Sequence, residues 1–278
     1  MIDKRRAIND IDEDLAWLES RYRRLDLPGW PAAEIFDGGG RGEALIFVPV
    51  PAPFDVIHVP GIRHFSETFR IVGYRRRESA DRRIYPAERA AEIAAIMNAL
   101  GIQRAHFCGL NEGAIAAFSL AKTEPERVAS IVCTSIGMDN VVPRFEQWLG
   151  RAIRLDLSPA LVGKAISALM LRKAPDNFLV AHLWSKNPKP MVALRNGVLP
   201  LYERYDLPVR QLTMPVLNIN SSPVVSLDSA RRFVEALPHG YLREIPGYCH
   251  LCMWTRPAEF NALMEEFYSR IMPADARS

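Results

Sequence analysis

The first 24 residues show the apolar spacing of an amphipathic helix. Apolar side chains recur every three or four positions with charged residues between them, which predicts a helix over 8–24. Pro28-Gly29-Trp30-Pro31 then ends this pattern. We therefore expect residues 1–32 to form a helical extension, which could pack on the domain, cover a site or pair with a second copy. The apolar positions are Ile8, Ile11, Leu15, Leu18 and Tyr22.

Beyond residue 32 the pattern changes to short buried strands that alternate with longer amphipathic helices. This order is typical of a mostly parallel sheet with right-handed crossovers. Residues 138–208 interrupt it with several helical segments, including 159–171 and 177–184, which predicts a helical cap inserted into one α/β domain formed by 33–137 and 209–278. The predicted strands are 44–48, 69–73, 105–108, 128–134, 214–220 and 241–245, and the predicted helices are 85–100, 112–122, 227–237 and 257–271.

Composition narrows the class of protein. A chain of 278 residues with 49% hydrophobic content can bury the core of one large domain. The 35 basic and 32 acidic residues nearly balance, so no nucleic-acid partner is expected. No apolar run approaches the roughly 20 residues that span a bilayer. Four cysteines are too few for a disulfide scaffold, and we expect a cytoplasmic protein without a membrane partner.

The most informative stretch is Cys108-Gly109-Leu110-Asn111-Glu112-Gly113, where a buried strand meets a helix rich in small residues. Two glycines bracket one residue, as in a strained turn that displays a side chain at the carboxyl edge of a sheet. The displayed residue here is Asn111. A carboxamide is not a useful nucleophile near neutral pH, so covalent catalysis at this position is not expected.

The chain resembles the α/β-hydrolase family over roughly residues 33–272. The likeness rests on four local patterns, namely 99–113 around the strained turn, 124–128, Met214-Pro-Val-Leu217, and 245–260 with its Gly247-Tyr-Cys-His250 loop. The resemblance implies an α/β-hydrolase fold: a mostly parallel central sheet flanked by helices, with a helical cap.

The resemblance also implies a catalytic nucleophile, histidine, acid and oxyanion hole, of which this chain keeps only His250 in full. Asn111 stands at the nucleophile position, and Ser222 replaces the usual acid after the strand at 214–220. In the oxyanion loop, Pro49-Val50-Pro51 replaces His-Gly, which puts the donor role of Val50 in doubt. The backbone amide of Glu112 remains a donor. Ordinary serine-hydrolase activity is therefore not expected.

Asp139 is a weak candidate for a substitute acid beside His250, because some family members carry the acid after the strand at 128–134. The residue fits equally well as the N-cap of the first cap helix. Cys249-His250-Leu251-Cys252 contains metal-ligating residue types, but zinc would need further ligands and the resemblance already explains the histidine. We predict no metal and no other cofactor.

Two interpretations of the function remain open, with a third behind them. In the first, His250 acts as acid or base in non-hydrolytic chemistry of the lyase, cyclase or isomerase type, with Asn111 positioning a small, largely apolar substrate. In the second, the chain is an inactive module that binds a ligand or a protein; the third is a hydrolase of non-standard mechanism. Aromatic residues of the cap that could line a pocket, or simply pack, are Trp148, Phe178 and Trp184. A homodimer through the N-terminal helix is worth testing.

Overall fold

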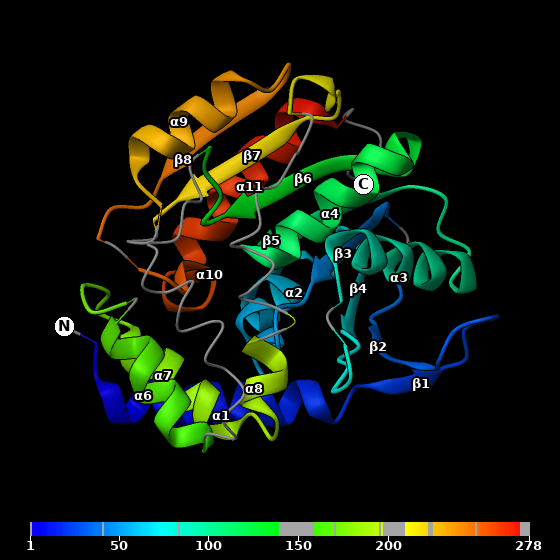
Figure 1. Ribbon diagram of the computed structural model, residues 1–278. Helices are drawn as coiled ribbons and strands as arrows, with labels where there is room; N and C mark the ends of the chain where they lie inside the picture. The colour runs from blue at the N-terminus through cyan, green and yellow to red at the C-terminus, as the bar shows by residue number, and fades with distance from the viewer. Residues whose placement is uncertain are drawn as a thin grey trace.

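An eight-stranded sheet runs through the centre of the molecule (Figure 1). The computed structural model describes residues 2–40, 42–82, 84–138, 158–169, 171–194, 196, 209–221, 225–247 and 249–272. The strand order is β1-β2-β4-β3-β5-β6-β7-β8, in which β1, β2 and β4 pair antiparallel and all other neighbours pair parallel. The strands are β1 Arg23–Leu25, β2 Ala33–Asp37, β3 Ala44–Val48, β4 Arg70–Arg75, β5 Ala105–Leu110, β6 Val128–Thr134, β7 Val216–Asn220 and β8 Gly240–Glu244.

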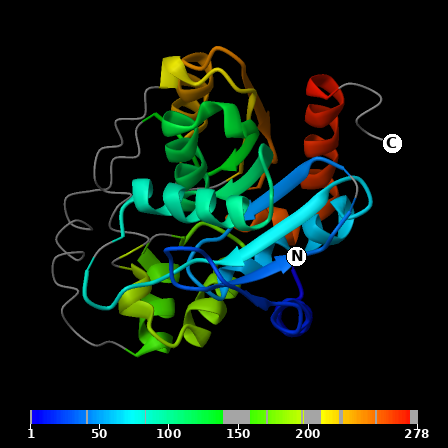
Figure 2. The same cartoon turned by 90° about the vertical axis from the view of Figure 1, so that its right-hand side faces the viewer.

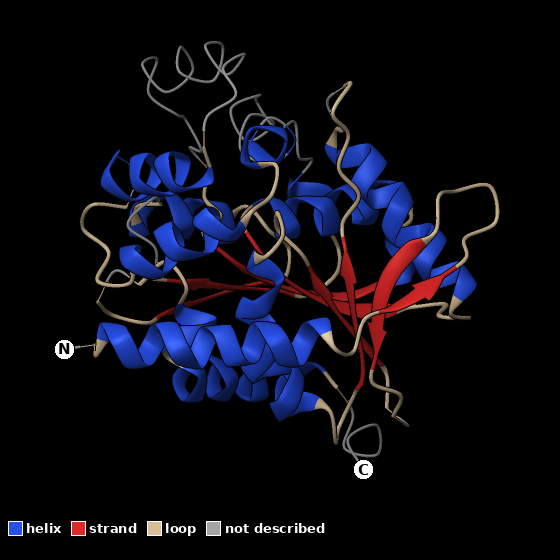
Figure 3. Cartoon of the chain, turned by 90° about the horizontal axis from the view of Figure 1, so that it is seen from below, coloured by secondary structure: helices blue, strands red, loops and turns tan. Residues whose placement is uncertain are grey.

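Helices cover both faces of this sheet, as Figures 2 and 3 show. Each face buries its own apolar cluster. One cluster lies beneath α3 (Pro86–Ala99), α4 (Glu112–Thr123) and α9 (Leu227–Glu235). The other lies beneath α1 (Lys4–Glu19), α2 (Val59–Phe65), α10 (Cys252–Thr255) and α11 (Pro257–Ile271). No helix in the described part of the chain has the length and apolar character needed to cross a bilayer. The predicted α/β-hydrolase architecture is thus confirmed.

The N-terminal helix differs from its prediction at both ends. It begins at Lys4 because the Asp3 carboxylate accepts the amides of Arg5 and Arg6 at 3.1 and 3.2 Å. It ends at Glu19, so the prediction of helix as far as residue 24 was wrong. The chain instead enters β1, which pairs with β2 at the edge of the sheet. Part of the predicted extension over 1–32 therefore belongs to the sheet.

Between β6 and β7 lie α6 (Pro159–Leu169), α7 (Asn177–Lys186) and α8 (Pro190–Ala193). The helices predicted at 159–171 and 177–184 correspond to α6 and α7. These two pack on each other, and α7 also contacts α1. Residues 139–157 and 197–208 lie outside the described ranges, so the cap boundaries of 138–208 stay a prediction.

Two aspartates of α1 connect distant parts of the chain. Asp12 accepts hydrogen bonds on α7, with 2.8 Å to His182 Nε2 and 3.1 Å to Lys186 Nζ. Asp14 accepts the indole N–H of Trp254 on α10 at 2.8 Å. Helix α1 therefore touches both α7 and the short helix α10.

Short elements that sequence patterns did not predict complete the fold. The loop after β3 leads into η1 (Phe54–His58) and then α2, while η2 (Pro125–Arg127) precedes β6 and η5 (Val209–Gln211) precedes β7. His58 in η1 is fully enclosed, and its ring lies 5.2 Å from that of Phe47. Burial lowers the pKa of His58 from 6.5 to about 4.

Candidate active site

Asn111 occupies the sharp turn between β5 and α4. Its backbone has φ 47° and ψ −112°, a conformation outside the regions that residues other than glycine ordinarily adopt. The turn is crowded, because a Cβ on Gly113 would lie 2.6 Å from the carbonyl oxygen of Val48 and one on Gly109 would lie 2.5 Å from the amide of Ala114. The predicted strained turn is therefore present. Within the described ranges the Asn111 carboxamide makes no hydrogen bond.

Two backbone amides near this turn are those of the predicted oxyanion donors, whose role stays a prediction. The amide of Glu112 opens α4, and that of Val50 lies in the loop after β3. Neither donates a hydrogen bond to any other residue in the described part of the chain. The loop is held from the far side by Asn187, whose Nδ2 donates to the carbonyl of Ala52 at 2.6 Å. Two donors are thus available at the carboxyl ends of β3 and β5.

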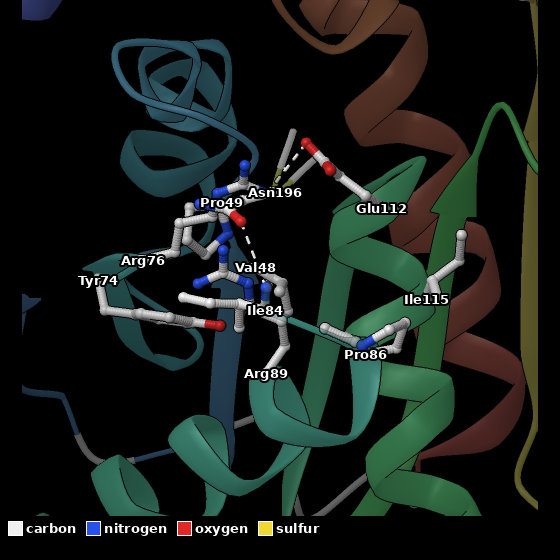
Figure 4. Close-up of a pocket in the computed structure, with 11 residues that line it drawn as sticks. Val48, Pro49, Tyr74, Arg76, Ile84, Pro86, Arg89, Glu112, Ile115 and Asn196 are labelled. Atoms are coloured by element: carbon white, nitrogen blue, oxygen red, sulfur yellow. Dashed lines mark hydrogen bonds and ion pairs between the residues drawn. The ribbon is translucent and has the colours of Figure 1, made fainter. Parts of the chain in front are cut away.

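The Glu112 side chain turns into a separate pocket between α3, α4 and the ends of β3 and β4 (Figure 4). Its carboxylate pairs with Arg76 at 3.0 Å, and Arg76 also pairs with Glu78 at 2.6 Å. Burial raises the pKa of Glu112, although Arg76 acts in the opposite direction. The carboxylate is committed to this ion pair, so Glu112 can serve the turn only through its backbone amide.

His250 lies in the loop between β8 and α10. The hydroxyl of Ser221, directly after β7, donates to the carbonyl of Cys249 at 2.7 Å. On the other side of His250, the thiol of Cys252 lies beside the hydroxyls of Ser221 and Thr134. Thr134 ends β6, and its carbonyl accepts the amide of Asn111 at 2.9 Å. The histidine loop and the strained turn therefore meet at the same edge of the sheet.

Asp176, which precedes α7, reaches the histidine loop from outside the sheet. Its side chain is fully buried and accepts the backbone amides of His250 at 3.1 Å and Leu251 at 2.6 Å. The thiol of Cys249 donates to the same carboxylate at 3.2 Å. Burial lowers the pKa of His250, and Asp176 partly opposes that effect. Asp176 does not stand out in the sequence, since an aspartate before a helix is typical of an ordinary N-cap.

Two buried polar atoms at this edge have no hydrogen-bond partner among the described residues. They are Oγ of Ser135 and Oδ1 of Asn220, at the ends of β6 and β7. Ser135 also has a positive φ of 59°. Buried polar groups are nearly always paired, so this cluster marks a place where water or a ligand would bind.

The remaining predicted site residues are not brought to this edge by any described contact. Asp139 and Trp148 lie outside the described residues, as does Ser222. Trp184 is buried with its ring 5.4 Å from that of Phe54, and Phe178 lies under Lys4 of α1, 5.6 Å from Nζ to the ring centroid. These are packing contacts, and a substrate-binding role for the two aromatic residues stays a prediction.

Comparison with known proteins agrees with the architecture. No protein-family model matches the chain. A curated protein, "Putative carbamate hydrolase RutD" from Caulobacter sp. (strain K31), is 28% identical over 229 residues, which cover 76% of this chain and 84% of that protein.

Solved structures with much lower sequence identity share the whole fold. A thermophilic esterase from Thermogutta terrifontis has a TM-score of 0.75 at 16% identity, over 91% of this chain and 99% of that one. The enol-lactonase from Burkholderia xenovorans LB400 has a TM-score of 0.69 at 16% identity, over 89% of this chain and 100% of that one. The carboxylesterase CesB from Bacillus subtilis has a TM-score of 0.67 at 14% identity, over 94% of this chain and 98% of that one. The chain has the α/β-hydrolase fold.

Proposed function

We propose that the protein is an α/β-hydrolase-fold enzyme that performs non-hydrolytic acid/base chemistry on a small, largely apolar molecule, with His250 as the acid/base group. The observation that carries this proposal is the strained turn at Asn111. Strained backbone persists mainly where the surroundings enforce it and is concentrated at functional sites. Here it displays a carboxamide with no hydrogen bond inside the described structure, a group suited to binding rather than to nucleophilic attack.

The reaction would move a proton without forming an acyl-enzyme. Burial keeps the pKa of His250 low, so the neutral imidazole is available as a base near neutral pH. It would accept a proton from the substrate next to a carbonyl group and return it at another atom. The amides of Glu112 and Val50, with the Asn111 carboxamide, would hold the oxygen on which negative charge develops.

Direct hydrolysis by water is a second candidate, favoured by the similarity to RutD, which is named as a carbamate hydrolase. In this reaction His250 would take a proton from water as the water oxygen attacks the carbonyl carbon, and would give it to the leaving group. Asn111 would again be a binding group. Incubation in ¹⁸O-labelled water separates the candidates, since only hydrolysis places the label in a product carboxylate or carbamate.

The test compares two histidine variants. Small ketones, hydroxy-ketones, lactones and carbamates are incubated with the protein in D₂O, and deuterium uptake and product formation are followed by mass spectrometry. We expect His250→Gln to abolish conversion of any accepted compound. His64→Gln, at a surface histidine paired with Glu265 at 2.8 Å, is the matched control and should convert normally. A folded His250→Gln protein that converts every accepted compound at the normal rate would refute both candidates.

A fluorophosphonate probe examines the acyl-enzyme route independently. We expect no covalent label at the strained turn, because Asn111 has no hydroxyl or thiol. Time-dependent labelling of the peptide that contains residues 105–122 would contradict the non-covalent mechanism.

A further inference from the structure

The histidine loop is fastened by a buried carboxylate from a different part of the chain. Both oxygens of Asp176 are used: Oδ1 accepts the amide of His250, and Oδ2 accepts the amide of Leu251 and the Cys249 thiol. Hydrogen bonds to a charged acceptor are stronger than neutral ones. In the described part of the chain no lysine or arginine pairs with Asp176, so its partners there are the amides of His250 and Leu251 and the thiol of Cys249.

We propose that Asp176 is the positioning residue of His250, which replaces the acid absent after β7 by fixing the histidine loop through two amides and placing a negative charge beside the imidazole. The proposal rests on the proposed acid/base role of His250. This proposal assigns the role to a different carboxylate from the predicted Asp139. Asp139 follows the strand at 128–134, whereas Asp176 lies in the segment that precedes α7.

The other titratable groups at the loop cannot supply that charge. Among the described residues these groups are Cys249, Cys252 and Arg256, and Arg256, whose guanidinium donates to the carbonyl of Pro246, carries a positive charge. Burial raises the pKa of Cys252 to about 11 and that of Cys249 further still, so both thiols are neutral near pH 7. The hydroxyls of Ser221 and Thr134 on the sheet side do not ionise in this range. Asp176 is therefore the one negative charge that these described groups place at the loop.

This arrangement predicts a specific change when the charge is removed. Asp176→Asn keeps the size of the side chain but leaves one oxygen to accept two amides and removes the charge that favours the imidazolium. The pKa of His250 should then fall, so the acid limb of the kcat/KM profile should move to lower pH. A weaker base also abstracts a proton more slowly, so kcat/KM on the plateau of the pH profile should drop at least about tenfold.

The experiment uses the full-length protein in three forms: wild type, Asp176→Asn and Asp176→Glu. NMR titration of ¹⁵N-histidine-labelled protein follows the His250 ring, assigned by its loss in His250→Gln. We expect the ring to titrate at lower pH in Asp176→Asn and to return toward the wild-type value in Asp176→Glu. Asp12→Asn is the matched control, because that carboxylate also reaches α7 but contacts His182 rather than the loop. It should leave the titration of His250 unchanged.

Each outcome decides one question. An unshifted His250 titration in a folded Asp176→Asn protein would overturn the proposal, even if the plateau fell, because that is the result of a merely structural residue. If Asp176→Asn does not fold, the wild type still gives an answer: the amides of His250 and Leu251 should exchange slowly with D₂O, and exchange at solvent rates would overturn the proposal. A shifted titration in a protein without any turnover would support Asp176 and count against the proposed function alone.

Discussion

Replacing Asn111 by glycine should stabilise the protein, which is unusual for a substitution at a candidate active site. Asn111 has φ 47° and ψ −112°, and a non-glycine residue held in such a region carries roughly 1–3 kcal/mol of strain. Glycine removes that strain but widens the unfolded ensemble, which costs about 0.4–1 kcal/mol. The carboxamide makes no hydrogen bond in the described structure, so none is lost. The net gain in the free energy of unfolding should be roughly 0–2.6 kcal/mol, with a midpoint of about 1.3 kcal/mol.

Thermal unfolding of purified Asn111→Gly measures this gain. At roughly 2–4 °C per kcal/mol for chains of comparable size, Tm should rise by a few degrees. The matched control is Asn9→Gly, because Asn9 is exposed in the middle of α1, where glycine should lower stability by a few tenths of a kcal/mol. If the two variants lose stability equally, the turn is not strained. Asn111→Gly should also bind substrate more weakly, since it lacks the carboxamide.

Three further substitutions test the packing and charges around the site. Gly113→Ala should lower Tm, because the new Cβ would meet the Val48 carbonyl oxygen at 2.6 Å, and a cost below about 1 kcal/mol would contradict the crowding. His58→Leu should flatten the pH dependence of unfolding. Above pH 6.5 the ring is neutral in both states, and from there down to about pH 4 the unfolded chain binds a proton that the folded chain does not. The free energy of unfolding of the wild type should therefore fall by up to about 3 kcal/mol as the pH drops from 6.5 to about 4. If the free energy of unfolding of His58→Leu changes with pH as steeply as that of the wild type, His58 is not the source of the effect. Arg76→Met should lower the free energy of unfolding in urea by about 3–5 kcal/mol, because it leaves Glu112 buried without its partner. Glu112→Gln should lower it by less, and the reverse order would contradict the ion-pair geometry.

Local patterns in the sequence were sufficient for the core of the fold and for part of the site. The turn at Asn111 could be predicted because two glycines, a buried strand and a small-residue helix are contiguous in sequence. The helix boundary near residue 20 could not, since Tyr22 fits the helical spacing while its hydroxyl donates to the buried carboxylate of Asp55 at 2.5 Å. Tertiary contact, rather than periodicity, determines where that helix ends.

The carboxylate at the histidine loop shows a second limit of sequence patterns. Asp176 and His250 are 74 positions apart, and no spacing rule connects an aspartate before a helix with a histidine after a strand. Strand β1 at the edge of the sheet and its neighbour β2 were missed for another reason. Strand β1 has only three residues, too few for a pattern, and the five residues of β2 include two acidic side chains, so they lack the continuous apolar run of β3.

The position of α1 has a consequence for the order in which the protein assembles. Its Asp14 bonds to Trp254, 240 residues later, and its Asp12 bonds to α7. During synthesis the first helix therefore leaves the ribosome long before the last of these partners exists. Its contacts with η1 and with Phe36 can form early, but those with α7 and Trp254 have to wait until these later segments are made. Docking of α1 against α7 and α10 is thus a late, long-range step of folding.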